Sequence, residues 1–154
     1  MKFKNRYIAY LLCLMTVSSC LHKTECDETV NSSAQLGFYE IVNQKAVSIM
    51  YDNVTVYGLS SDSLIYNNVD SVRSVILPMN HSADSCIFVM RIESVTDTLL
   101  FRYTRKLEFI SENCGFSTEF RLTKLETTNH NIDSVKIENP DINSSKSENI
   151  QIYY

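Results

Sequence analysis

Apolar and polar residues alternate in short runs along most of this chain, which is the two-residue period of a half-buried β-strand. In one such run Val54 and Val56 alternate with Thr55 and Tyr57. Past the first 20 residues, no long window carries the 3.6-residue apolar period of an amphipathic helix. Asn, Asp and Ser separate the runs roughly every 8–12 residues, a spacing typical of β-sandwiches and barrels.

This pattern predicts an all-β fold, an antiparallel β-sandwich (immunoglobulin-like or similar) of about eight to nine short strands. Pro78 should end one strand, because proline cannot donate a ladder hydrogen bond. The alternative fold is a small helix packed on a sheet, with Val69–Ile76 as the helix. The predicted strands are Ala34–Ile41, Lys45–Asp52, Val54–Leu59, Ser63–Asn68, Val72–Leu77, Cys86–Ser94, Thr98–Glu112, Gly115–Glu126, Ile132–Glu138 and Asn149–Tyr154.

The first 20 residues follow a different pattern. Three basic residues are followed by the short apolar run Tyr7–Val17, and small residues precede the cysteine in Val17-Ser18-Ser19-Cys20. The apolar run is about half the ~20 residues needed to cross a bilayer, and its length and small-residue cleavage site are typical of a signal peptide. We therefore expect a lipoprotein signal peptide at 1–19, acylation of Cys20, a lipid-anchored tether at 20–33 and a single β-sandwich domain at 34–154.

The expected location is the cell envelope, anchored by lipid to a membrane, with the outer membrane favoured. The alternative is an ordinary secretory signal cut near Ser19, which leaves the cysteine at the cut unexplained. Removing residues 1–19 leaves 11 lysines and arginines against 18 acidic residues, a net charge of −7. That charge disfavours nucleic acid and anionic lipid surfaces as partners, since both require a basic patch. A protein or glycan partner stays open.

Three cysteines remain once Cys13 leaves with the signal and Cys20 carries lipid, so one intramolecular disulfide can form in three ways. We favour Cys26 with Cys114, because Cys114 lies in a predicted turn and Cys26 lies in the tether. Cys86 opens an apolar run and is expected to be a buried thiol. The alternative is that all three are free.

We expect a lipid-anchored cell-envelope protein with a structural or binding role. No residues are expected to be catalytic, cofactor-binding or metal-binding, and we expect no cofactor and no enzyme activity. The three histidines lack metal-ligand spacing, and no glycine-rich phosphate loop occurs. A nucleophilic pair of Cys86 with His81 is less favoured than core packing of the thiol. A hydrolase that uses scattered acidic residues is a further alternative, although one sequence cannot show a pair of acids converging on a cleft.

Aromatic residues suggest another alternative, a glycan- or peptide-binding surface module. Alternating aromatics on adjacent predicted strands are assigned mainly to the core. They are Phe101, Tyr103, Phe109, Phe116 and Phe120. An exposed tyrosine platform would instead favour binding, and its candidates are Tyr57, Tyr66, Tyr153 and Tyr154.

Three segments carry a resemblance to a known family. They are Val75–Asn80, Leu100–Tyr103 and Phe109–Phe116, the last of which includes a Ser-x-x-Cys-Gly-Phe pattern. Together they resemble a family of small Bacteroidota lipoproteins known only as a domain of unknown function, 6452. The resemblance implies lineage and location, and it implies no activity.

An Asp-Ser/Thr pair followed by Leu or Val occurs four times, where average composition would give roughly one match to an Asp-Ser/Thr pair followed by a small or branched apolar residue. This looks like the acceptor motif for O-glycosylation in Bacteroidota envelope proteins. An equally weighted interpretation is structural, because Asp-Ser forms turns and the apolar residue then opens a strand. The candidate acceptors are Ser63, Ser71, Thr98 and Ser134.

Overall fold

The structure is a computed structural model that describes residues 32–59, 63–112, 114–143 and 147–154. Within these ranges the chain forms strands and no helix, so the described part has no helix long and apolar enough to cross a membrane. The strands are β1 (Ser33–Val42), β2 (Lys45–Ser48), β3 (Val54–Gly58), β4 (Leu64–Val69), β5 (Ser74–Pro78), β6 (Ser85–Ile92), β7 (Val95–Ser111), β8 (Gly115–Thr127), β9 (Ser134–Ile137), β10 (Asp141–Ile142) and β11 (Ile150–Tyr153).

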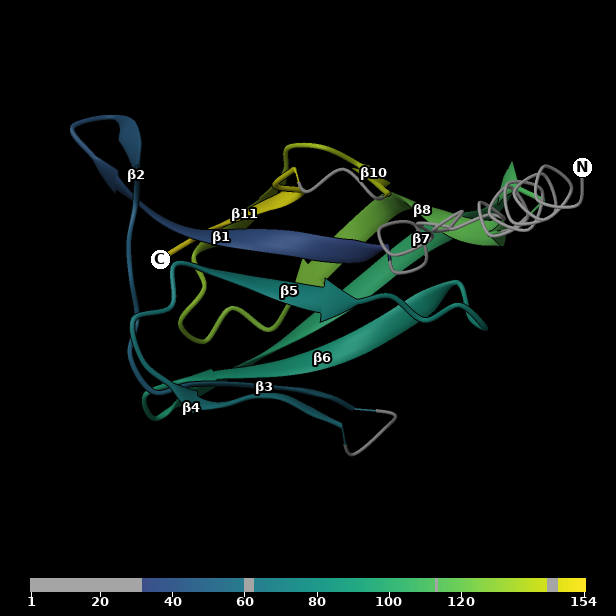
Figure 1. The fold of residues 1–154 in the computed structure, drawn as a ribbon. Helices are drawn as coiled ribbons and strands as arrows, with labels where there is room; N and C mark the ends of the chain where they lie inside the picture. The colour runs from purple at the N-terminus through teal and green to yellow at the C-terminus, as the bar shows by residue number, and fades with distance from the viewer. Residues whose placement is uncertain (1–31, 60–62, 113, 144–146) are drawn as a thin grey trace, which may run out of the picture.

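The strands form two sheets that face each other (Figure 1). The six-stranded sheet has the order β10-β8-β7-β6-β3-β4, and every pair in it is antiparallel. In the five-stranded sheet, β11 pairs with one edge of β1, and β9 pairs with the other edge of β11. Leu36 pairs with both Ile150 and Val75, and Tyr39 pairs with both Tyr153 and Ser48. Strands β5 and β2 therefore lie one after the other along the opposite edge of β1.

The all-β, sandwich-like fold is confirmed, with three differences of detail. Strands β1 and β11 pair in parallel, whereas an antiparallel sandwich was expected. The described residues hold eleven strands where eight to nine were expected, and the short β10 was not predicted. The alternative helix at Val69–Ile76 is wrong. Val69 ends β4 and Ser74 begins β5, because the β-branched and apolar residues of this segment pair with neighbouring strands.

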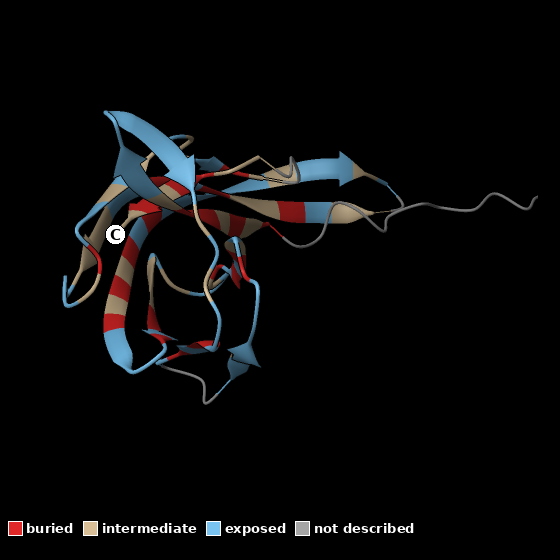
Figure 2. Cartoon of the chain, turned by 90° about the vertical axis from the view of Figure 1, so that its left-hand side faces the viewer, coloured by how far each residue is buried: buried red, intermediate tan, exposed pale blue. Residues whose placement is uncertain are grey.

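The core lies between the sheets, where alternate side chains of both sheets meet. Ala34, Leu36 and Phe38 of β1 are fully buried at a two-residue spacing. Phe101 in β7 is also fully buried and packs edge-to-face on Phe88. Figure 2 shows buried positions along the strands of both sheets, while the β1–β2 hairpin is exposed. The β1–β2 hairpin turns through Asn43 and Gln44, whose positive φ angles suit a two-residue hairpin loop.

Asp97 is a buried carboxylate that holds the connection between β8 and β9. Its Oδ1 accepts hydrogen bonds from the amide of His130 (2.6 Å) and the hydroxyl of Thr128 (2.8 Å). Its Oδ2 accepts from the amides of Asn131 (2.9 Å) and Ile132 (3.2 Å). Burial alone would raise the pKa of Asp97, but these hydrogen bonds outweigh burial and hold its pKa below the ordinary value of 3.8.

Asn149 is a buried amide that joins the two sheets at one edge. Its Oδ1 accepts a hydrogen bond from the amide of Gln35 in β1 (3.0 Å). Its Nδ2 donates to the carbonyls of Asn139 (3.1 Å) and Asp141 (3.0 Å). Asp141 belongs to β10, the edge strand that pairs with β8. The Asn149 side chain therefore connects β1 of the five-stranded sheet to the edge of the six-stranded sheet.

Candidate functional site at one end of the sandwich

The loop between β5 and β6 is fastened to β7 at one end of the sandwich. The Arg105 Nε donates a hydrogen bond to Asp84 Oδ1 (2.7 Å), and its Nη1 donates to the carbonyl of His81 (2.7 Å). The Tyr103 hydroxyl donates to the carbonyl of Asn80 (3.0 Å) and accepts from the Asn80 amide (3.2 Å). Burial is the main reason that the pKa of Tyr103 lies well above its ordinary value, so the hydroxyl stays protonated.

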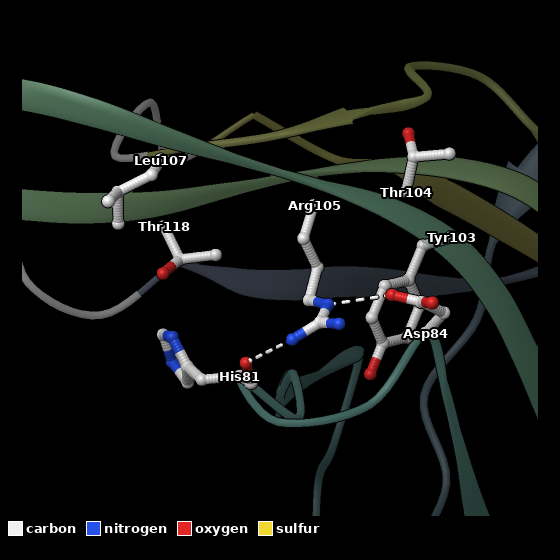
Figure 3. Close-up of a pocket in the computed structure, with 7 residues that line it drawn as sticks. All are labelled: His81, Asp84, Tyr103, Thr104, Arg105, Leu107 and Thr118. Carbon is white, nitrogen blue, oxygen red and sulfur yellow. Dashed lines mark hydrogen bonds and ion pairs between the residues drawn. The ribbon is translucent and has the colours of Figure 1, made fainter.

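A surface hollow of about 540 Å³ opens beside this loop (Figure 3). Its volume falls in the roughly 300–1,000 Å³ range of small-molecule sites. Its lining combines one Arg–Asp ion pair, a histidine, hydroxyl groups and one apolar side chain. The lining residues are His81, Asp84, Tyr103, Thr104, Arg105, Leu107 and Thr118. Because Asp84 neutralises Arg105, the hollow offers hydrogen-bonding groups to a polar ligand and little net charge.

The pair of Cys86 and His81 is not assembled as a nucleophile and base. The His81 ring packs edge-to-face on Phe120, whereas the Cys86 thiol faces the Tyr103 hydroxyl and lines a separate hollow. Burial raises the pKa of Cys86, although the hydrogen bond with Tyr103 opposes this in part. Cys86 is a free, half-buried thiol packed against the core, where full burial was expected.

Strands β7 and β8 continue past this hollow as a hairpin with one apolar face. On this face the register pairs Arg105 with Phe120, then Leu107 with Thr118, and then Phe109 with Phe116. The same face is buried at Phe120 and becomes exposed further out, with exposed fractions of 65% for Leu107, 55% for Phe109 and 60% for Phe116. We call Leu107, Phe109 and Phe116 the apolar strip. Its two phenyl rings touch edge-to-face at 5.2 Å.

The opposite face of the same hairpin is polar. Lys106 pairs in register with Glu119 and forms an ion pair with Glu108 (2.6 Å). At the end of the hairpin the amide of Cys114 donates to the Ser111 hydroxyl (3.1 Å), so Cys114 lies in the predicted turn. Its expected partner Cys26 lies outside the described residues, and the pairing stays a prediction.

The sequence assigned Phe109 and Phe116 to the core, and that assignment is wrong. Phe101, Tyr103 and Phe120 are buried as expected, but the outer pair extends beyond the reach of the facing sheet. No single tyrosine platform forms either. Tyr153 ends β11 and packs on Tyr39, and Tyr154, just after that strand, packs on Tyr51 and Phe38. Tyr57 lies in β3 of the six-stranded sheet. Tyr66 accepts a hydrogen bond from the amide of Ile76 (3.0 Å).

The four candidate glycosylation acceptors lie in different settings. Ser63, Ser71 and Ser134 are exposed, and Thr98 is half-buried within β7, where its amide bonds to Thr128 Oγ1 (3.0 Å). Two of the preceding aspartates serve as structural acceptors. Asp97 holds the β8–β9 connection, and Asp70 accepts from the amide of Asn53 (2.9 Å) while the Ser71 amide donates to Asp52 (2.7 Å). The turn interpretation therefore explains part of the pattern.

Several predicted features lie outside the described residues. They are the signal peptide at 1–19, the acylation site Cys20, nearly all of the tether at 20–33, and Cys26. Within 32–59, 63–112, 114–143 and 147–154, no group of three or more His, Cys, Asp or Glu side chains could hold a metal ion.

The fold and the site define an all-β, sandwich-like domain with a polar hollow and an exposed apolar hairpin at one end. Residues 53–154 match a family of unknown function, DUF6452. Because the match spans more than half of the 154 residues, the chain belongs to that family, as the sequence resemblance implied. No curated protein and no solved structure matches the chain.

Proposed function

We propose that this protein is a lipid-anchored cell-envelope protein with a binding rather than a catalytic role. The observation that carries the proposal is the segment Val17-Ser18-Ser19-Cys20 after a short apolar run. Two or three acyl chains anchor stably, because each buried methylene contributes about 0.8 kcal/mol and a single chain is marginal. The outer membrane is the favoured location.

The binding role is supported by two surface features at the end of the sandwich where β1 begins. Ser33 at the start of β1 pairs with Pro78, the last residue of β5, and the loop that follows is the one fastened by Arg105. The polar hollow and the apolar strip therefore lie at the end where the tether joins the domain (Figure 1). The charged groups of the hollow, Asp84 and Arg105, bind each other and hold that loop in place, which favours a binding role over a catalytic one.

Substitution Cys20→Ala should block processing and acylation. We expect full-length precursor to accumulate and labelling by an azido-palmitate analogue to disappear, because the sulfur that accepts diacylglycerol is gone. The measurement is gel mobility and click labelling in the native host, with globomycin as an independent block. The matched control is Cys13→Ala, a cysteine inside the apolar run, which should be processed and labelled normally. Normal processing of Cys20→Ala, or an unlabelled wild type, would contradict the anchor.

If the Asp-Ser/Thr motifs are glycosylated, occupancy should follow exposure. We expect modification at Ser63, Ser71 and Ser134 ahead of Thr98, because a half-buried residue of an internal strand is poorly accessible to a transferase. Peptide mapping of protein from its native host measures each site, and the three serine-to-alanine changes together should remove the excess mass. A native mass equal to that of the lipidated polypeptide would contradict glycosylation, and the turn interpretation would then account for the whole pattern.

A further inference from the structure

The apolar strip is an exposed continuation of the core face of β7 and β8. Tyr103, Phe120 and Leu122 on this face are buried by the opposite sheet, whereas Leu107, Phe109 and Phe116 extend beyond it. Ile110, at the end of β7, is also more than a third exposed. Large apolar side chains gathered on one projecting element mark an interaction site more often than scattered ones do.

The position of the strip relative to the tether favours a bilayer as its partner. The apolar strip and the start of β1 lie at the same end of the domain, while the β1–β2 hairpin lies at the opposite end (Figure 1). The six residues Lys106–Ser111 extend β7 about 20 Å past Arg105 at about 3.3 Å per residue. The 12 residues between Cys20 and Ser33 span at most roughly 40 Å. A lipid on Cys20 therefore leaves this end of the domain within reach of the membrane.

The tether itself is a poor partner for the strip. Residues 21–31 contain only two large apolar side chains, Leu21 and Val30, among charged and hydroxyl residues. The arrangement of the hairpin also suits an interface between lipid and water. Leu107, Phe109 and Phe116 share one face, and the ion pair of Lys106 with Glu108 lies on the other, where it can stay hydrated.

We propose that the β7–β8 hairpin inserts the apolar strip into the membrane surface that carries the acylated Cys20. The lipid and the hairpin then form two separate attachments that fix how the domain is oriented on the bilayer. This inference rests on the proposed lipid anchor. The partner of the apolar strip is the boundary between acyl chains and headgroups. The contact is apolar rather than electrostatic, as expected for an acidic mature chain that lacks excess basic residues.

The test uses a single introduced tryptophan, because the chain has none. Mature Phe109→Trp protein, acylated at Cys20 in its native host, is reconstituted into vesicles of phosphatidylethanolamine and phosphatidylglycerol with brominated acyl chains. We expect emission to fall by about half or more, since interfacial side chains lie roughly 5–10 Å into the headgroup and acyl boundary. The matched control is Ile41→Trp, which is 59% exposed in the hairpin at the opposite end and should not be quenched. Adding Leu107→Ser and Phe116→Ser to Phe109→Trp should abolish the quenching.

The outcomes separate this inference from the anchor itself. Protein that never partitions into the vesicles would contradict the anchor, and the hairpin inference with it. Anchored Phe109→Trp protein that is quenched no more than the Ile41→Trp control would overturn the hairpin inference and leave the anchor standing. Unquenched but blue-shifted emission that depends on protein density would also overturn it, because a second copy would then cover the strip.

Discussion

Replacing Asp97 by Asn should lower the free energy of unfolding by about 3 kcal/mol, since three backbone amides would lose a charged acceptor and two of them would lose their acceptor altogether. The asparagine can present one oxygen, so its NH₂ group would face the amides of Asn131 and Ile132, which are donors themselves. We expect the melting temperature of the mature Cys20→Ser chain to fall by about 10 °C. Chemical unfolding followed by circular dichroism measures the change.

The control for Asp97 is Asp133→Asn, an exposed aspartate just before β9 that should change stability by less than about 0.5 kcal/mol. The pH dependence gives a second reading. Because the folded pKa of Asp97 lies below its unfolded value, the stability it contributes is present above about pH 4 and is lost as pH falls through the folded pKa. The Asn variant should therefore lose less stability than wild type below pH 4. Equal losses in both proteins would contradict the assigned role.

Replacing Asn149 by Ala should cost a similar amount, about 3 kcal/mol, because three backbone groups lose their partner at once. The amide of Gln35 would lose its acceptor, and the carbonyls of Asn139 and Asp141 would lose their donor. Hydrogen exchange should report this locally. The Gln35 amide should exchange much faster than its neighbours in β1, whereas a purely global loss of stability would affect all amides of the sheet together.

Two comparisons sharpen the Asn149 prediction. Asn149→Asp keeps the acceptor for Gln35 but sets a carboxylate against two carbonyl oxygens, so it should be at least as destabilising as the alanine at neutral pH. At low pH the protonated carboxyl can donate to one of them, so part of the loss should be recovered. Asn67→Ala, at an exposed position of β4, is the control and should be near neutral. A near-neutral Asn149→Ala would show that the two sheets do not depend on this amide.

The existence of most strands was predictable from alternation alone. Alternation reports which side chains share a face, and it is indifferent to the direction of the neighbouring strand, so the parallel pairing of β1 with β11 could not be read from it. Strand β10 was missed because two residues, Asp141 and Ile142, are too short to show any period.

The candidate site was harder to predict, for a related reason. Phe109 and Phe116 alternate in the same way as Phe101 and Phe120, and only the reach of the facing sheet decides which of them are buried. The roles of Asp97 and Asn149 depend on contacts across 33 and 114 residues of sequence, which a local pattern does not contain. The lipid-anchor prediction, by contrast, needs only contiguous residues, because a signal peptidase reads an extended segment.

The parallel pair of β1 and β11 has a consequence for biogenesis. The edge of β1 that receives β11 must wait until residues 150–153 have been synthesised, since Gln35 and Asn149 are 114 positions apart. Contacts of such long range slow folding, and an unpaired strand edge can recruit other chains in the meantime. The nascent domain should therefore present an open β-edge until β11 has been synthesised, and a holdase that shields such edges should raise its yield.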